Sequence, residues 1–452
     1  MKYKTVLLLI SSFMCLYCGP EYKKHNFIWE RRYDFNRESD RVDKVIVSKR
    51  GDLFVLGSSY KTTDEGDRKM YGILKKFSSK GKEDKKNWNK KIETDFFDAD
   101  TNLTIDKNDN IYVAGRWYET LTDQRRRNWW VKKYSPNGKE DAEHWGNKIF
   151  WKDSYFRLSA IDVDNKNNLY VGGNDRVETE DVRDIGDEDG LWWIKKYNEN
   201  GVEDTNNWDK RNDNGNNDVL YETKVDKKNN IYLSGGGRRT VAGKKEYYSW
   251  IRKYDENGVE DKNWDKRFSP NDNSIYWIII LIDLANNIYT VGMLNDNSDG
   301  ETTLRIKKFS EDGIEDKNWD KKYFRNNSFN LEAAAIDKYN NIYVAGYGNN
   351  LVSAHSERDM WIRIIGFDGQ EDLIKWDKKI DGKNLDDEAY GIAIDAFNDV
   401  YVVGRGTDLI AKMTEKGEEM LFDPNVPEEK KIEIEKRASY GDWWILKFRG
   451  ER

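Results

Sequence analysis

Seven copies of one short apolar run, each ending in glycine, divide most of the chain into similar units. The runs begin 54 to 62 residues apart, and most follow an aspartate and an asparagine in the pattern D-x-x-x-N. They are LFVLG (53–57), IYVAG (111–115), LYVGG (169–173), IYLSG (231–235), IYTVG (288–292), IYVAG (342–346) and VYVVG (400–404). Such a period indicates a repeat architecture, in which no unit buries its apolar face alone.

Each unit predicts four short strands. Strand A precedes the aspartate, strand B is the repeated run, strand C resembles WWIKKY (192–197), and strand D carries a later Trp. β-branched and aromatic residues dominate these segments, as strands prefer. A G-x-E-D segment follows strand C in six units, and Asn-Gly pairs such as Asn137-Gly138 supply the positive φ of a tight turn. Four-stranded units repeated around an axis form a β-propeller.

The two ends of the chain complete each other. The last unit stops without a strand D, whereas IWERRY (28–33) near the N-terminus matches a strand D that has no unit of its own. The sequence therefore predicts an all-β, seven-bladed β-propeller of four-stranded blades over 27–452 as a single domain. The N-terminal strand closes the ring by pairing with the C-terminal blade, which carries an insertion at 405–442.

The run IDKNDNIYVAG (105–115), followed by WWVKKYSPNG (129–138), resembles the SBBP-type (seven-bladed β-propeller repeat) proteins of bacteria, and specifically their lipoproteins. The resemblance covers almost everything from residue 27 to residue 452. It implies the fold and no particular reaction, because one fold hosts many functions.

The first residues form a targeting segment. Lys2 and Lys4 precede an apolar stretch, Val6–Tyr17, that is shorter than the ~20 residues of a membrane-spanning helix. Together with Cys18 it resembles a bacterial lipoprotein signal, which implies a signal peptide at 1–17 and a lipid-anchored tether at 18–26. An ordinary secretory peptide and modification of Cys15 are the alternatives. The chain has no other cysteine, so no disulfide framework is expected.

Charge and histidine content exclude several classes of function. The 76 Lys and Arg against 83 Asp and Glu give a net charge of −7, which argues against nucleic-acid binding. The three histidines, His25, His144 and His355, fall in different units. This distribution argues against histidine-based zinc sites and Ser-His-Asp catalysis.

The two faces of the expected propeller differ. The A–B and C–D turns share one face and are nearly uniform, whereas the B–C and D–A connections share the other and vary in length and chemistry. Variable loops on a rigid scaffold are typical of recognition sites. The nine residues from Cys18 to Phe27 reach at most ~30 Å. We therefore expect the turn face to lie toward the membrane and the variable face outward.

Aromatic residues in the D–A connections are the candidate ligand-binding residues, because exposed rings stack on sugars or anchor protein partners. Packing between neighbouring blades is the alternative, and we favour it. The residues are Phe96, Phe97, Trp151, Tyr155, Phe156, Phe324 and Phe329.

Two acidic or polar segments are candidate calcium sites. One contains Asp187 and Asp189; the other, Asn295-x-Asn297-x-Asp299, resembles the opening of an EF-hand loop but lacks its final glutamate. We favour solvated loops for both and expect no cofactor. The adjacent carboxylates of G-x-E-D point to opposite faces of a strand, so we assign them a turn role.

The leading functional interpretation is a monomeric, lipid-anchored propeller of the cell envelope, on the outer membrane and either periplasmic or surface-facing. It binds a protein or glycan through the variable face without catalysis. One alternative is a periplasmic scaffold for envelope assembly. The other is a carbohydrate-active enzyme that uses two acidic residues near the central channel, since glycoside hydrolysis needs only two carboxylates at a set separation.

Overall fold

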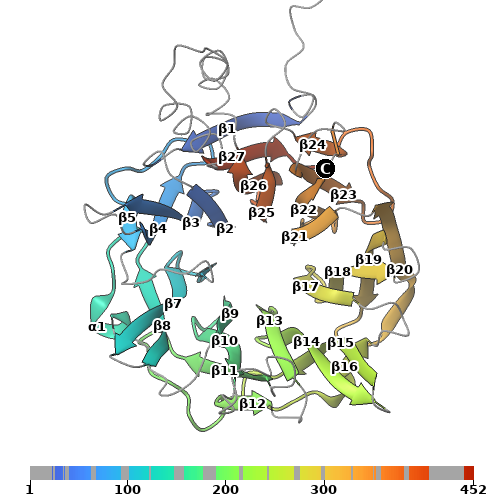
Figure 1. Cartoon of the computed structure of the whole chain (residues 1–452), viewed down its shortest axis with the longest axis horizontal. Coiled ribbons are helices and arrows are strands. Elements are labelled where there is room, and N and C mark those ends of the chain that lie inside the picture. Colours follow the sequence, from blue (N-terminus) through green and yellow to red (C-terminus); the bar gives the residue numbers. More distant parts are fainter. Residues whose placement is uncertain are drawn as a thin grey trace, which may run out of the picture.

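In the computed structural model, seven antiparallel sheets form a ring around a central axis, as the sequence predicts (Figure 1). The structure describes residues 23, 26–33, 35, 40–62, 68–92, 101–121, 124–146, 157–176, 190–212, 217–241, 244–268, 275–296, 301–326, 329–349, 351–352, 358–380, 386–406 and 442–451. Each sheet forms one blade, with its A strand innermost.

The strands follow the order A to D from the channel outward. Blade 1 consists of β2 (Asp40–Val47), β3 (Leu53–Thr62), β4 (Arg68–Phe77) and β5 (Lys90–Ile92). Blade 2 contains β6 (Asn102–Ile105), β7 (Ile111–Leu121), β8 (Gln124–Tyr134) and the short helix α1 (Ala142–Trp145). Blade 3 consists of β9 (Arg157–Val163), β10 (Leu169–Arg176), β11 (Gly190–Tyr197) and β12 (Lys210–Asn212). Blade 4 consists of β13 (Asn217–Val225), β14 (Ile231–Val241), β15 (Lys244–Tyr254) and β16 (Lys266–Phe268), with the 3-10 turn η2 (Lys262–Trp264).

The remaining blades repeat this plan. Blade 5 consists of β17 (Ile275–Ile282), β18 (Ile288–Asp296), β19 (Glu301–Phe309) and β20 (Glu315–Asn326). Blade 6 consists of β21 (Phe329–Ile336), β22 (Ile342–Asn349), β23 (Arg358–Ile365) and β24 (Lys378–Ile380). Blade 7 consists of β25 (Glu388–Ile394), β26 (Asp399–Gly406), β27 (Asp442–Arg449) and β1 (Phe27–Tyr33). Within the described residues, blade 2 has three strands, and residues 147–156 lie outside them.

The ring closes by pairing of the two chain ends. β1 runs antiparallel to β27, with Phe27 opposite Phe448 and Tyr33 opposite Trp443, and Figure 1 shows the two strands side by side. The expected closure is therefore confirmed. Because β27 ends at the turn face, β1 begins at that face. Most of the predicted insertion at 405–442 lies outside the described residues.

An aspartate organises the A–B turn in six of the blades. In blade 4, Asp226 Oδ1 accepts hydrogen bonds from the backbone N–H groups of Lys228 and Asn230, and Oδ2 accepts one from Asn230 Nδ2 at 2.8 Å. Asn229 has φ +63°, a left-handed conformation that asparagine tolerates. This Asx turn explains the D-x-x-x-N pattern. The equivalent residues are Asp106, Asp164, Asp283, Asp337 and Asp395.

The repeated Trp joins neighbouring blades. The Trp208 ring packs edge to face on Tyr170 of blade 3 at 4.8 Å and on Tyr254 of blade 4 at 6.0 Å. Its Nε1 donates to the carbonyl oxygen of Glu256 in blade 4 at 2.8 Å. Equivalent indole hydrogen bonds to the next blade come from Trp29, Trp88, Trp145, Trp264 and Trp376.

The expectation that this Trp lies on strand D is wrong for most blades. Trp145 ends α1 and Trp264 ends η2, both before the outer strand position. The aspartate of G-x-E-D caps the turn: Asp261 accepts from the backbone N–H of Asn263 at 3.0 Å. In blade 5 the equivalent Trp319 lies on the extended strand β20 and packs on Tyr289 at 5.3 Å, so both local conformations bury the indole.

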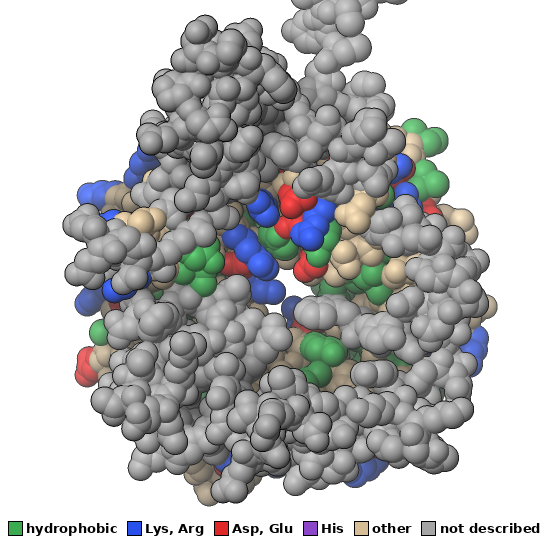
Figure 2. Space-filling view, viewed as in Figure 1, with side chains coloured by type: hydrophobic (Ala, Val, Ile, Leu, Met, Phe, Trp, Pro, Cys, Tyr) green, Lys and Arg blue, Asp and Glu red, His purple; other side chains and the backbone are tan. Residues whose placement is uncertain are grey.

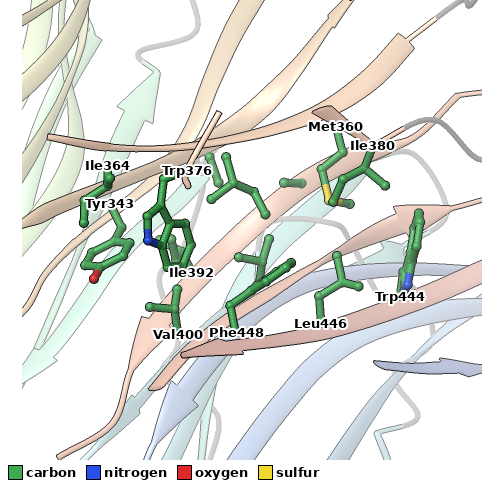
Figure 3. Close-up of a cluster of buried hydrophobic side chains, with 14 residues drawn as sticks. Tyr343, Met360, Ile364, Trp376, Ile380, Ile392, Val400, Trp444, Leu446 and Phe448 are labelled. Atoms are coloured by element: carbon green, nitrogen blue, oxygen red, sulfur yellow. The ribbon is translucent and has the colours of Figure 1, made fainter. Parts of the chain in front are cut away.

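The apolar core consists of seven clusters, and each lies between two neighbouring blades. Figure 3 shows the cluster of blades 6 and 7, where the Trp376 ring lies 5.1 Å from Tyr343 and 5.8 Å from Phe448. The buried apolar side chains are therefore distributed around the whole ring, and they support the inner strands of every blade.

Candidate functional site

The six glutamates of the G-x-E-D segments are structural. Each lies beside a basic residue of strand C that precedes it by eight residues: Lys75–Glu83, Lys132–Glu140, Lys195–Glu203, Arg252–Glu260, Lys307–Glu315 and Arg363–Glu371. In blade 1 the Lys75 Nζ lies 2.6 Å from Glu83 Oε1, and Tyr33 donates to Glu83 Oε2 at 3.0 Å. We call these six pairs the ion-pair belt. Their acids already have partners within the scaffold.

Most of the candidate residues from the sequence lie outside the described residues, namely Cys18, Phe96, Phe97, Trp151, Tyr155, Phe156, Asp187, Asp189, Asn297 and Asp299. Asn295 lies on β18 and Phe324 on β20, and only their backbone placement is described. The Phe329 ring is 4% exposed and packs edge to face on Trp361 at 5.6 Å, in keeping with the packing alternative. Within the described ranges, no group of three His, Cys, Asp or Glu residues could hold a metal, and no helix is long and apolar enough to cross a bilayer.

The two faces differ in the connections that they carry. A–B connections are nearly constant, as in 48–52, 106–110, 226–230 and 395–398. B–C connections range from 122–123 and 242–243 to 177–189 and 407–441. The variable connections all leave from the end of the blades opposite the Asx turns. This end also opens into the central channel, which makes the channel mouth part of the same face.

The last position of the repeated run in strand B requires glycine, because the inner strand approaches it closely. A Cβ on Gly346 would lie 1.9 Å from the carbonyl oxygen of Asn330, and one on Gly404 would lie 1.9 Å from that of Glu388. Both contacts are far below van der Waals distance, so no side chain fits. The inner strand approaches here because its register shifts by one residue beside the glycine, which is a β-bulge.

The bulge recurs at one level of five inner strands. Its extra residues are Asp43, Ser159, Tyr221, Glu332 and Tyr390, in blades 1, 3, 4, 6 and 7. A bulge redirects a side chain and is frequent beside active sites. The equivalent bulge position therefore occurs five times around the channel, and different blades place different residue types there. Figure 2 shows Lys, Arg, Asp and Glu side chains gathered around the central opening.

Blades 1, 6 and 7 form a polar wall at the channel mouth. Arg358 of blade 6 forms an ion pair with Glu388 of blade 7, and the Tyr390 hydroxyl donates to the same carboxylate. The Arg41 guanidinium of blade 1 lies 4.3 Å from the Tyr390 ring centre, and its Nε lies 2.6 Å from Asp43 Oδ1. The wall therefore offers guanidinium groups and an aromatic ring next to one another.

Lys44 and Glu332 face the channel below this wall. Neither makes a hydrogen bond or ion pair with any described residue. Burial raises the pKa of the Glu332 carboxyl, against the opposing effects of Arg41 and Lys44. The surrounding ring lowers the pKa of the Lys44 amine, although Lys44 is exposed to solvent and Glu222 and Asp43 oppose the shift. The influence of Glu222 in blade 4 on Lys44 in blade 1 indicates that these groups face one another across the channel.

The acids nearer the turn face are held by hydrogen bonds. Glu222 pairs with Lys224 at 3.1 Å and accepts from the backbone N–H of Ile280 at 2.7 Å. Asp162 accepts from the backbone N–H groups of Val225 at 2.8 Å and Val163 at 2.9 Å. These contacts link the inner strands of blades 3, 4 and 5. These two acids are thus part of the scaffold. Lys44, which follows the bulge of its strand as Glu222 does, and Glu332 have no such partner among the described residues.

This arrangement suits a polar ligand that carries both donors and acceptors. A carboxyl with a raised pKa keeps its proton to higher pH and then donates a hydrogen bond, and an amine with a lowered pKa is more readily neutral. The sequence predicts acidic residues near the channel but does not identify which ones. Alignment of the A strands against the repeated glycine would reveal the bulge position, which is acidic only at Asp43 and Glu332 among the five bulged strands.

The sequence matches no protein-family model and no curated protein. Among solved structures, the chain is similar to the polysaccharide lyase Uly1, with 10% identity, a TM-score of 0.50, and coverage of 94% of this chain and 100% of that one. It is also similar to an acylaminoacyl peptidase of Pyrococcus horikoshii (12% identity, TM-score 0.49, 83% of this chain and 51% of that one). A third is virginiamycin B lyase of Staphylococcus aureus (8% identity, TM-score 0.42, 83% and 96%). At these identities the likeness concerns the fold alone.

Proposed function

We propose that the protein is a non-enzymatic β-propeller, anchored to the cell envelope through Cys18, that binds a protein or glycan on its variable face. One observation carries the proposal: the A–B connections are nearly constant, whereas the B–C connections range from 122–123 to 407–441. Both kinds of connection join antiparallel strands, so the requirements of the scaffold do not explain why only the B–C connections vary in length. The wall at the channel mouth, with Arg41 and Tyr390, forms the floor of that face.

The test of binding uses the purified full chain on an array of polysaccharides and extracellular-matrix proteins. We expect the double variant Arg41→Ala/Tyr390→Ala to lose at least roughly tenfold in affinity for any probe bound, as loss of a central interface residue commonly causes. The matched control is Lys166→Ala, in the A–B turn of blade 3, where the lysine pairs with Glu256 on the turn face. Equal losses in both variants would contradict binding at the variable face.

Anchoring is tested separately, by protease treatment of intact cells and by fractionation of a Cys18→Ala variant. Removal of the wild type from intact cells, with loss of the variant from the membrane fraction, is the expected result for a surface-facing lipoprotein. Protection until the outer envelope is opened would support a periplasmic scaffold instead. A variant that stays in the membrane fraction would contradict lipidation of Cys18.

The second candidate function is a carbohydrate-active enzyme. It is favoured by the raised pKa of the Glu332 carboxyl at the channel. A carboxyl whose pKa is raised by burial can serve as a general acid, and Glu388 supplies a second carboxylate at the channel mouth. The measurement is release of reducing ends from the same polysaccharides. Turnover that Glu332→Gln abolishes without loss of binding would establish the enzyme. Binding without turnover in the wild type would exclude it for those substrates.

A further inference from the structure

Exposed apolar side chains gather at the turn face of the described structure. Of eleven large hydrophobic residues that are exposed within the described ranges, nine lie in A–B or C–D connections. They are Val202, Val259, Leu284, Ile314, Tyr339, Phe367, Leu373, Ile374 and Phe397. Ile374 is 87% exposed, Ile314 is 70% exposed and Phe397 is 62% exposed. Exposed apolar side chains gathered on one face are typical of an interaction site.

The turns themselves do not require these residues. The position after the turn glycine is Lys82 in blade 1 and Lys139 in blade 2, but Val202, Val259 and Ile314 in blades 3 to 5. All five turns have the same positive-φ glycine. Because the same backbone accepts lysine, folding does not explain the apolar choice in blades 3 to 5.

A pocket at the closure between blades 7 and 1 adds positive charge to the turn face. Its volume is about 540 Å³, and its lining residues are Ile28, Trp29, Ser79, Lys80, Phe397, Asp399, Lys447 and Arg449. Lys447 is bound within the scaffold, 2.7 Å from Asp399 and 2.8 Å from the Ser79 carbonyl oxygen. The charged ends of Lys80 and Arg449 make no hydrogen bond or ion pair with any residue that the structure describes. We call this the closure pocket.

Several cations elsewhere on the turn face are paired. Lys166 lies 2.6 Å from Glu256, and Lys228 lies 2.7 Å from Glu311. Lys375, beside Ile374, lies 3.3 Å from Glu451. Lys80 and Arg449 have no such partner among the described residues, and both line the closure pocket together with the exposed Phe397.

The chain enters the propeller at this pocket. Phe27 is paired with Phe448 at the end of β27, and Ile28, 36% exposed, lines the pocket itself. The N-terminal segment with the proposed lipid attachment point, Cys18, therefore joins the fold beside the two free cations. The exposed apolar turn residues, the two cations of the closure pocket and the beginning of β1 therefore all lie on the turn face.

We propose that the turn face docks on the surface of an anionic phospholipid bilayer. The apolar turn tips of blades 3 to 7 enter the interface, and the closure pocket holds a lipid phosphate between Lys80 and Arg449. Amphipathic surfaces with basic residues bind membranes in this way, through buried apolar area and attraction to anionic lipid. The inference rests on the proposed envelope location. It makes the propeller itself, and not the tether alone, a membrane-binding element that holds the variable face away from the bilayer.

The test places a fluorophore on each face of the full chain. Cys15 and Cys18 are replaced by serine, and one cysteine is introduced at a time by Ile374→Cys, Phe397→Cys or Val352→Cys. Val352 is 50% exposed and lies in the B–C connection of blade 6, which makes it the matched control. Each variant carries an environment-sensitive dye and is mixed with vesicles of phosphatidylcholine with or without phosphatidylglycerol.

We expect the dyes at 374 and 397 to shift to shorter wavelength with phosphatidylglycerol vesicles, and the dye at 352 to keep its emission in water. Lys80→Glu/Arg449→Glu should reduce the shift of the dye at 374 roughly tenfold or more at equal lipid, as two reversed charges near an anionic surface imply. The matched pair Lys61→Glu/Lys69→Glu, at the B–C ends of β3 and β4, should leave the shift unchanged. Salt should weaken the shift.

Three outcomes would overturn the proposal: no shift at 374 and 397, an equal shift at 352, or equal losses from the two charge-reversed pairs. Residues 6–17 are common to all variants, so binding through them would affect both charge-reversed pairs equally and cannot produce a difference between those pairs. The result is also separable from the proposed function, because fractionation of Cys18→Ala tests the anchor without reference to the turn face.

Discussion

The ion-pair belt and the central channel both carry many charged side chains. Those of the belt are paired with one another, whereas two in the channel have no partner among the described residues. In the belt, Lys75 and Glu83 have side chains that are 6% and 8% exposed, and each has further hydrogen-bond partners in Asn89 and Tyr33. In the channel, Lys44 and Glu332 have no such partner among the described residues. The belt pairs are eight residues apart across a hairpin, so each repeat forms its own pair. The channel groups come from different blades, and no repeated geometry pairs them.

The difference indicates what each region contributes. Paired and hydrogen-bonded charges are tolerated in a scaffold, whereas an enclosed charge without a partner costs stability. Departures from local consistency of this kind are typical of functional sites. We therefore expect substitutions in the belt to destabilise the fold and matched substitutions in the channel to stabilise it.

The largest expected effect belongs to the tryptophans that join the blades. Trp208→Ala should lower the free energy of unfolding by about 4 kcal/mol, because it removes a buried ring shared by blades 3 and 4. Urea unfolding followed by circular dichroism measures the loss. Trp208→Phe should cost less, since it keeps much of the packing and loses mainly the indole hydrogen bond. A loss below about 1 kcal/mol for Trp208→Ala would mean that the blades do not depend on this contact.

Removal of one belt carboxylate should have the next largest effect. Glu83→Gln leaves the buried Lys75 amine without an anion, and breaking a buried ion pair on one side costs about 3 kcal/mol. The measurement is urea unfolding at neutral pH. Lys75→Met/Glu83→Leu, which removes both charges, is the control and should recover much of the loss. If the double variant were as unstable as the single one, the loss of stability would come from altered packing and not from the unpaired charge of Lys75.

Substitution of Lys44 should sharpen the contrast in the opposite direction. Lys44→Met should raise the free energy of unfolding only slightly at neutral pH, because Lys44 is exposed to solvent, which screens its charge. Enclosure lowers the pKa of Lys44 in the folded chain, so the charged amine costs stability below that folded pKa. The cost disappears as the pH rises toward the unfolded value of about 10.4. Unfolding curves at several pH values should converge there, and a constant gain would point to packing.

The smallest effect is expected on the exposed turn face. Lys228 pairs with Glu311 at 2.7 Å, but the lysine side chain is 63% exposed, and exposed pairs contribute little. Lys228→Met should leave the urea midpoint unchanged within error, at low and at high salt. A clear loss that salt removes would show that the turn face also contributes charge pairs to stability.

The sequence predicts the fold well because the repeated residues act locally. Asp226 and Asn229 build their turn within five residues, and Trp208 packs on rings of its own blade and of the next one. The residues of each repeat therefore determine its local geometry. The closure is predictable for the same reason, since the N-terminal strand matches a missing part of the last repeat.

The channel was harder to predict because its residues do not repeat. Glu332 occupies a bulge, which no residue pattern in its own strand marks, and its neighbours Arg41 and Lys44 come from the other end of the chain. Phe329 shows the converse limit: an aromatic residue at the start of an inner strand is compatible with ligand contact or with packing, and its burial depends on Trp361 of strand C.

The most direct test of the division between scaffold and channel compares Glu83→Gln with Glu332→Gln in urea unfolding from neutral to acidic pH. We predict opposite signs at neutral pH: Glu83→Gln is less stable than the wild type, and Glu332→Gln is more stable. Burial raises the pKa of Glu332, so its charged form costs stability, and the gain should disappear as the pH falls toward the unfolded value of about 4.3. A loss of stability in Glu332→Gln at neutral pH would show that the channel carboxylate is as well satisfied as the belt, and would contradict the account.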